Sequence, residues 1–270
     1  MEFAAAEPEK IAAEIRRTGS AVVRGAWRPE SLTPFRTAIA NYVQVRRARA
    51  RTADARPLDR MLDTHGAGTA RMMANERYWT DEDFKNLFVG SIYSRICAAY
   101  FDGSELRMSM DRNGFRIHDP AVSEKSFIPY HQDSYTQDHR VKSVLNCWTP
   151  LDPAGVDAPG LEVVRNPCRP DFPRKEWGLA SANAAYDRIT IERERIVAEY
   201  GECFAAPALA VGDCLIFSEH VIHRTYVTPG MTKPRINLEF RVFARNVCVP
   251  VPGLPPIEAD TVSLSEEQRP

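Results

Sequence analysis

The sequence predicts an antiparallel jelly roll with α-helices packed against its outside. Several short apolar segments alternate in polarity and are separated by Gly, Pro or Asp, as half-buried strands joined by turns are. Helical periodicity is concentrated in the first hundred residues and in one later segment. Strands that follow a block of helices in this way favour a β-sheet core with helices around it. The fold class is therefore mainly β with flanking α-helices.

The first fifty residues supply a helix, a strand and a second helix. Glu7 to Thr18 is amphipathic and ends at Gly19, a residue typical of helix C-termini. Ser20 to Arg24 reads SAVVR, which has the composition of a strand. Trp27 to Ala48 places its apolar residues at helical spacing, and Pro29 lies near its start, where proline is tolerated. We expect these apolar residues to belong to the core.

Residues 46 to 101 are less uniform. Five arginines between 46 and 56 have no aromatic residues among them, so we interpret them as a solvated face or loop and not as a nucleic-acid site. Residues 57 to 79 lack periodicity and predict a long loop. One apolar stripe follows from Thr80 onward, and Thr80 with Asp83 resembles a capping box. We therefore expect one continuous helix over residues 80 to 101.

The rest of the chain supplies most of the expected strands, and a helix is expected at Thr190 to Tyr200. The stretch from Asn166 to Ala210 is longer than a strand connection needs, so we interpret it as a cover over the mouth of the barrel. No linker divides the chain, which predicts a single domain over 1–270, with a helical region at about 1–101 and a jelly-roll core at about 104–248. The expected strands are short runs within 105–117, then 144–151, 161–165, 213–218, 222–227 and 235–244.

Composition narrows the possible partners. The formal net charge of −1 gives no general attraction to nucleic acid or to anionic membranes. The six cysteines show no Cys-x-x-Cys spacing. This is typical of free thiols in a reducing compartment. The N-terminus has acidic residues where a signal peptide has basic ones, and no apolar stretch approaches a membrane span. We expect a cytoplasmic protein that binds neither nucleic acid nor membrane.

A His-x-Asp pair, His131 and Asp133, is the first candidate for chemistry. In an extended segment, residues two apart project to the same side, so both side chains can reach one metal ion. A neutral imidazole, a carboxylate and a second imidazole form the facial triad that suits non-haem Fe(II) and leaves coordination positions open. A motif this short also arises by chance, so residues elsewhere must support it.

Support comes from residues 211 to 241. They contain Gly-Asp before an apolar strand, then His223, then Arg235 at the head of an alternating strand. His220 competes with His223 as the third ligand, but strand positions three apart face opposite sides, so at most one points at the metal. His118 has no carboxylate two residues later, and we interpret it as a histidine at a strand end and not as a ligand.

This arrangement resembles the phytanoyl-CoA dioxygenase family of Fe(II)/2-oxoglutarate-dependent oxygenases. The resemblance implies that His131, Asp133 and His223 bind iron. It also implies that Arg235, about a dozen residues after the last histidine, anchors the 5-carboxylate of 2-oxoglutarate. The fold that it implies is the double-stranded β-helix, a cupin-like jelly roll, which agrees with the strand pattern.

The same resemblance extends to neighbouring residues and to the reaction. The spacing of the family's motif favours His223 over His220 as the third ligand. The resemblance also implies that Thr225 helps to hold the distal carboxylate of 2-oxoglutarate, and Arg241 is the alternative to Arg235 as its anchor. The implied reaction consumes O2 and 2-oxoglutarate, releases succinate and CO2, and hydroxylates a small-molecule substrate. Because Asp133 occupies a coordination position, hydroxylation is favoured over halogenation, while desaturation and ring formation stay open.

Two other classes of protein fit the same motif. Zn(II) binds such ligands more tightly than Fe(II), so a zinc-dependent hydrolase is one alternative, although a hydrolase has no use for Arg235 at its position. The other is a non-catalytic jelly-roll protein with a structural or sensory metal site. The motifs carry no signal for the identity of the substrate or for the oligomeric state.

Overall fold

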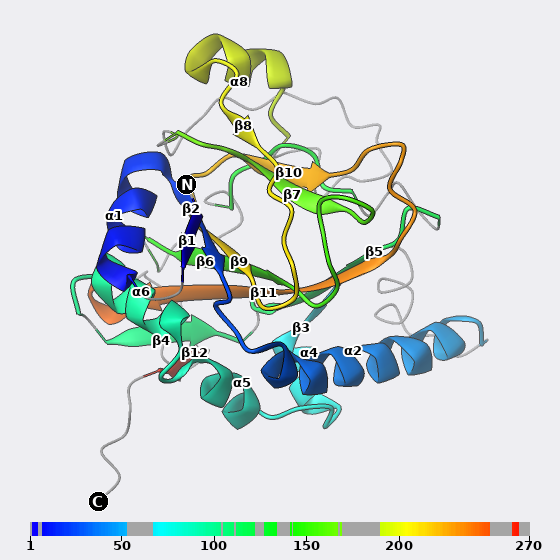
Figure 1. Cartoon of the computed structure of the whole chain (residues 1–270). Helices are drawn as coiled ribbons and strands as arrows, with labels where there is room; N and C mark the ends of the chain where they lie inside the picture. Colours follow the sequence, from blue (N-terminus) through cyan, green and yellow to red (C-terminus); the bar gives the residue numbers. More distant parts are fainter. Residues whose placement is uncertain are drawn as a thin grey trace, which may run out of the picture.

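Two β-sheets, one large and one small, carry the fold of the computed structural model (Figure 1). The structure describes residues 2–4, 7–52, 67–103, 105–110, 112–121, 127–133, 141, 143–166, 168, 190–248 and 261–264. The strands of the large sheet are β1 (Glu2–Ala4), β2 (Ser20–Arg24), β3 (Ala67–Thr69), β4 (Leu106–Ser109), β5 (Gly114–His118), β6 (Leu145–Pro150), β9 (Cys214–Ser218), β11 (Arg235–Ala244) and β12 (Thr261–Ser263). The strands of the small sheet are β7 (Gly160–Val164), β8 (Phe204–Ala205) and β10 (His223–Tyr226).

The large sheet has the order β1-β2-β9-β6-β11-β4-β12, and β5 pairs with both β11 and β3. The small sheet has the order β10-β7-β8. Only the β1–β2 pair is parallel among the strand pairs of the described residues. Antiparallel strands in two facing sheets confirm the predicted mainly β, jelly-roll class.

Helices cover the outer side of the large sheet, and one helix lies beside the small sheet (Figure 1). α5 begins as predicted, because the Thr80 hydroxyl accepts from the Asp83 backbone N–H and the Asp83 carboxylate accepts from that of Thr80. No helix in the described part of the chain is both long and apolar enough to cross a bilayer. The helices are α1 (Pro8–Thr18), α2 (Pro29–Ala50), α4 (Ala70–Asn75), α5 (Asp81–Phe88), α6 (Ile92–Tyr100) and α8 (Arg193–Tyr200), with a 3-10 turn η3 at Arg245–Val247.

β11 is the central strand, and both of its faces are covered. Leu238, Phe240 and Val242 lie in the main hydrophobic core under the helices, where the Phe240 ring meets Phe88 edge-on at 4.5 Å. The alternate side chains point between the two sheets, because successive residues of a strand face opposite ways. These inward residues are polar: Arg235, Asn237, Glu239 and Arg241. A polar row inside the barrel indicates a ligand pocket.

The predicted helix over residues 80 to 101 is wrong as a single element. It is two helices, α5 and α6, separated at Gly90, whose φ of +74° lies in the left-handed region. Ser91 then caps α6 by accepting from the Ser94 backbone N–H over 3.1 Å. Apolar periodicity continues through the break, which explains why the sequence pattern did not reveal it.

Two further expectations for the N-terminal region are corrected. Within residues 57 to 79, expected as a loop, β3 and α4 form, and the rest of that range before residue 67 lies outside the described residues. Arg46, expected on a solvated face, is buried, forms an ion pair with Glu76 and stacks its guanidinium over Tyr42 at 5.1 Å. At the other end of the chain, after the predicted core ends at about residue 248, β12 pairs with β4.

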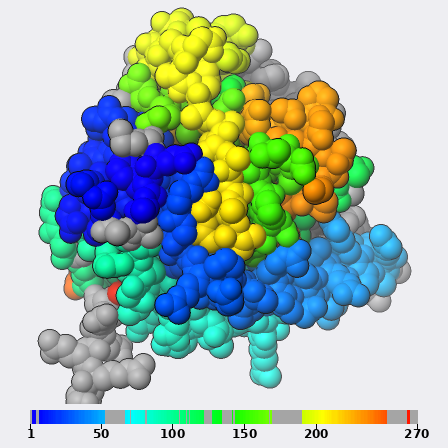
Figure 2. All heavy atoms as spheres, viewed as in Figure 1, coloured from blue at the N-terminus to red at the C-terminus, as the bar shows by residue number. Residues whose placement is uncertain are grey.

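Much of the connection from 166 to 210 lies outside the described residues. Its described end contains α8 and β8, and the chain then runs over the surface between β2 and the loop after β6 (Figure 2). There Leu209 and Ala154 exchange two backbone hydrogen bonds of 2.9 Å. The proposed cover over the barrel mouth concerns residues 167 and 169–189 above all, so it stays a prediction.

The break at Gly90 leads to a stability prediction. A Cβ added there meets no atom within 4 Å, so Gly90→Ala introduces only the strain of a left-handed backbone. We expect the free energy of unfolding, measured by urea denaturation, to fall by about 1 kcal/mol. Gly230→Ala is the control, because its Cβ also meets open space and its φ is not left-handed. Equal losses at the two positions would contradict the assignment of strain.

Candidate metal centre and its pocket

Backbone pairing places two histidines side by side. The His131 N–H donates to the His223 carbonyl, and the His223 N–H donates to the His131 carbonyl, each over 3.0 Å. On its other edge, β10 pairs with β7. Residues directly opposite in an antiparallel pair point to the same face, and the two imidazole centroids are 4.2 Å apart. The His-x-Asp segment is thus attached to the edge of the small sheet.

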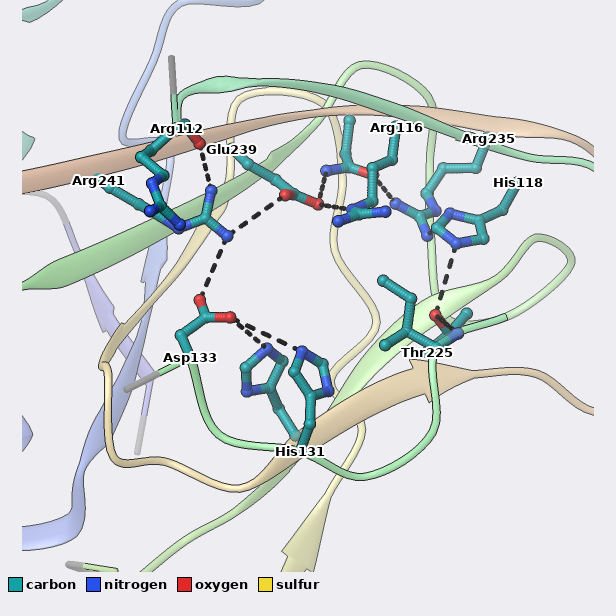
Figure 3. Close-up of polar contacts among 12 residues, drawn as sticks. Arg112, Arg116, His118, His131, Asp133, Thr225, Arg235, Glu239 and Arg241 are labelled. Atoms are coloured by element: carbon teal, nitrogen blue, oxygen red, sulfur yellow. Dashed lines mark hydrogen bonds and ion pairs between the residues drawn. The ribbon is translucent and has the colours of Figure 1, made fainter. Parts of the chain in front are cut away.

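Asp133 completes the cluster that the sequence predicts. Its Oδ1 atom lies 3.7 Å from Nε2 of His131 and 3.9 Å from Nε2 of His223 (Figure 3). One ligand atom from each residue lies within 4.8 Å of the others, and all three residues are buried. Two imidazoles and one carboxylate converging in this way could hold one cation and leave further coordination positions open.

Each imidazole presents its Nε2 atom to the cluster because Nδ1 is engaged elsewhere. His131 Nδ1 lies 2.8 Å from the Pro129 carbonyl, and His223 Nδ1 lies 2.9 Å from the Val221 carbonyl. A carbonyl only accepts, so we assign the proton to Nδ1, which leaves the Nε2 lone pair free for a metal. Burial, and then the neighbouring His223, lowers the pKa of His131 to about 3, which keeps this ring neutral.

Arg241 holds the second oxygen of Asp133. Its Nη2 atom donates to Oδ2 over 3.3 Å, while Oδ1 faces the histidines. Burial alone would raise the pKa of Asp133, but Arg241, followed by the two histidines, keeps that pKa well below its usual value. The structure therefore places Arg241, predicted as an alternative cosubstrate anchor, beside the metal cluster.

Arg235 lies at the opposite end of the pocket and is only 1% exposed. It donates to Asn237 Oδ1, contacts His118 Nδ1 at 2.7 Å and stacks over Trp148 at 4.6 Å. No described residue forms an ion pair with it, and its Nε atom has no described partner. Burial lowers the pKa of Arg235 to about 9, so the guanidinium is still charged at neutral pH.

Thr225 faces the same pocket from β10, two residues after His223. Its hydroxyl oxygen accepts from the Ile128 backbone N–H over 3.0 Å. Because His118 Nδ1 accepts from Arg235, we assign the His118 proton to Nε2, which lies 3.4 Å from the Thr225 oxygen. The Thr225 oxygen then accepts twice, and its O–H is left to donate into the pocket.

His118 is the pocket residue that sequence reasoning missed. It ends β5, as expected, and is outside the metal cluster, but it links Arg235 to Thr225. The sequence did contain one indication of this role: Arg116 and His118 are two residues apart, so both side chains project to the same face of the strand. His220 lies away from the cluster, with its Nε2 atom 3.2 Å from the Glu219 carboxylate.

A second set of contacts holds the two histidine segments from the other face of the small sheet. Tyr130, next to His131, and Arg224, next to His223, both donate to the same oxygen of Glu162 on β7, Arg224 Nε over 2.6 Å. The Arg224 guanidinium also stacks over the Tyr130 ring at 4.7 Å. We call Tyr130, Glu162 and Arg224 the outer clamp, because it joins the neighbours of both histidines through one buried carboxylate.

A family model described as phytanoyl-CoA dioxygenase (PhyH) matches residues 15–229. The chain belongs to this family. The match includes His131, Asp133 and His223, and it ends before β11, which carries Arg235. As a phytanoyl-CoA dioxygenase family member, the chain is a non-haem iron, 2-oxoglutarate-dependent enzyme.

Solved structures of other proteins share the fold of this family member. EvdO2 from Micromonospora carbonacea var. aurantiaca, complexed with 2-oxoglutarate, aligns with a TM-score of 0.61 at 17% identity, over 92% of this chain and 93% of that chain. The non-heme alpha ketoglutarate dependent epimerase SnoN from nogalamycin biosynthesis aligns with a TM-score of 0.54 at 13% identity, over 93% of each chain. No curated protein matches the sequence. At these identities the likeness is one of fold.

The outer clamp predicts an effect on metal binding. Glu162→Leu keeps much of the volume but leaves the Tyr130 hydroxyl and Arg224 without their shared acceptor. We expect Fe(II) affinity, measured by anaerobic titration, to fall about tenfold because the two imidazoles lose their support. Asp157→Asn, which breaks an exposed 2.8 Å pair with Lys233, is the control and should leave affinity unchanged. Unchanged affinity in both variants would refute the clamp.

Proposed function

We propose that this phytanoyl-CoA dioxygenase family member hydroxylates a small-molecule substrate with O2 and 2-oxoglutarate. One oxygen atom of O2 enters the substrate C–H bond as a hydroxyl group, and the other enters succinate as 2-oxoglutarate loses CO2. In this proposal His131, Asp133 and His223 bind the iron, and Arg235 with Thr225 binds the cosubstrate. Iron held there would supply activation of O2 coupled to decarboxylation of 2-oxoglutarate.

The buried charge of Arg235 is the observation that supports this proposal most directly. A guanidinium removed from water needs a compensating anion, and the described residues provide no carboxylate in contact with it. The free Nε–H of Arg235 and the O–H of Thr225 are both available to donate to the same ligand. A carboxylate of 2-oxoglutarate supplies the missing charge and accepts both bonds.

The role of Asp133 favours hydroxylation over halogenation. Its ionised oxygen occupies a position beside the two Nε2 atoms that a halide would otherwise take. The related fold of SnoN serves an epimerase, and that protein has been solved with Fe3+, alpha ketoglutarate and nogalamycin RO. A small organic substrate fits the same scaffold, and we propose one for this enzyme too.

We also propose that residues 1–270 form one domain in the cytoplasm. Support for one domain comes from the large sheet, which contains strands from both ends of the chain, β1 and β12. Support for a reducing compartment comes from the six cysteines, all of which are free thiols.

The ligand assignment is tested by exchanging the two competing histidines. His223→Ala should lower Fe(II) affinity and succinate production by more than about 100-fold, because it removes one of three buried ligands. His220→Ala should retain both, since its imidazole contacts Glu219 and not the cluster. Activity that survives His223→Ala and is lost in His220→Ala would reverse the assignment.

The cosubstrate assignment is tested at Arg235. Arg235→Lys keeps the charge but loses the planar fork, so the KM for 2-oxoglutarate should rise about tenfold or more. Initial rates of succinate formation at varied 2-oxoglutarate measure it. Arg16→Lys, on α1 beside Asp102, is the control and should leave that KM unchanged. An unchanged KM in Arg235→Lys would sink the assignment.

A further inference from the structure

Asn146, on β6, has no hydrogen-bond partner among the described residues. It is 4% exposed and lines the pocket, yet neither its amide nitrogen nor its amide oxygen is bonded. Buried amides are nearly always hydrogen-bonded, because an unmet donor or acceptor destabilises the fold. Asn237, a fully buried amide on β11, accepts from Arg235 and donates to Glu239 over 3.2 Å. The amide of Asn146 is therefore open to a ligand in the pocket, whereas that of Asn237 is bonded to protein groups.

The position of Asn146 connects it to the metal cluster through both neighbouring strands. It lies opposite Arg241 of β11 and opposite Phe217 of β9. Side chains directly opposite in an antiparallel pair share a face, so all three line the pocket. Arg241 contacts Asp133, and the Phe217 ring lies 4.8 Å from the His223 ring. A ligand on Asn146 would thus lie beside the metal.

The charge of the pocket selects the kind of ligand. The described residues that line it include three arginines and two carboxylates, an excess of one positive charge. A divalent cation and the dianion of 2-oxoglutarate offset each other, so the excess persists in the loaded pocket. Arg235 is assigned to 2-oxoglutarate, and Arg116 lies 3.0 Å from Glu239. Arg241 lies farther from Glu239, at 3.8 Å, and also donates to the Arg112 carbonyl. Once a cation draws on the charge of Asp133, its closer carboxylate partner, Arg241 carries the excess positive charge.

We propose that Asn146 and Arg241 form the subsite that binds a carboxylate of the substrate. The guanidinium and the amide N–H are the donors for the two carboxylate oxygens. Arg241 lies six residues along β11 from Arg235, about 20 Å between Cα atoms, so the two arginines serve different ends of the pocket. The substrate is then a small monocarboxylic acid, and its body packs on the apolar lining residues Ile128, Leu161 and Phe217.

This inference rests on the proposed function, so the test separates the two. Under anaerobic conditions, the visible charge-transfer band of Fe(II) with 2-oxoglutarate is recorded first, without any probe. Absence of the band refutes the proposed function. Hexanoate, octanoate and their primary amides are then titrated in, and changes in the band give their dissociation constants.

The acids should bind at least about tenfold more tightly than their amides, and Arg241→Gln should reduce this preference to within about twofold. Amides that bind as tightly as acids, or acids that do not bind at millimolar concentration, would overturn the subsite. Weaker 2-oxoglutarate binding in Asn146→Leu without any probe would assign the subsite to the cosubstrate, and so overturn it as well.

Stability gives a readout that does not depend on any ligand. Asn146→Leu should raise the midpoint of urea unfolding, because it removes an unmet buried amide, and it should weaken binding of the acids. Asn237→Leu should lower that midpoint, because it breaks the two hydrogen bonds of a buried amide on the adjacent strand β11. A fall in the midpoint for Asn146→Leu, with unchanged binding of the acids, would show that Asn146 is only structural.

Discussion

The candidate metal centre depends on the direct pairing of His131 with His223 by two backbone hydrogen bonds. Strand residues alternate faces, so a slip of one residue would turn one imidazole out of the pocket. The same alternation directs Tyr130 and Arg224, the neighbours of the histidines, to the opposite face, where both bind Glu162. The register that brings the candidate metal ligands together inside therefore also assembles the outer clamp, and each set of contacts stabilises the other.

β11 shows how the pocket is kept ready for charged ligands. Its apolar residues hold the strand against the helices, which leaves the inward row free to be polar at a cost in stability. Part of that cost is the desolvation of the Arg235 guanidinium, which also lowers the pKa of Arg235. Asn146 on the adjacent strand adds an unmet amide. Arg235 and Asn146 thus both line one pocket with polar atoms that have no described hydrogen-bond partner, and ligands there can supply one.

Sequence reasoning located elements well and contacts poorly. The strands expected between residues 144 and 244 appear within one residue of their predicted ends, because turn residues and alternation are local signals. The bonds of His118 to Arg235 and Thr225 depend on the register of β5 with β11 and on the approach of the second sheet. Sequence spacing does not encode either one. β1 and β12 were missed for the same reason, since such short strands are defined by their partners.

The contacts of the pocket carboxylates with arginines argue against a zinc hydrolase that uses the same three ligands. Hydrolysis of that kind needs a free general base near the metal-bound water. Among the described lining residues, Asp133 is a ligand candidate, and Glu239 lies between Arg116 and Arg241. Burial raises the pKa of Glu239, but Arg116 and Arg241 outweigh burial and hold this pKa below its usual value. Glu239 is therefore a weak base. The pocket instead offers cationic groups at both of its ends, Arg241 and Arg235, which suits a reaction that binds a dicarboxylate beside its substrate.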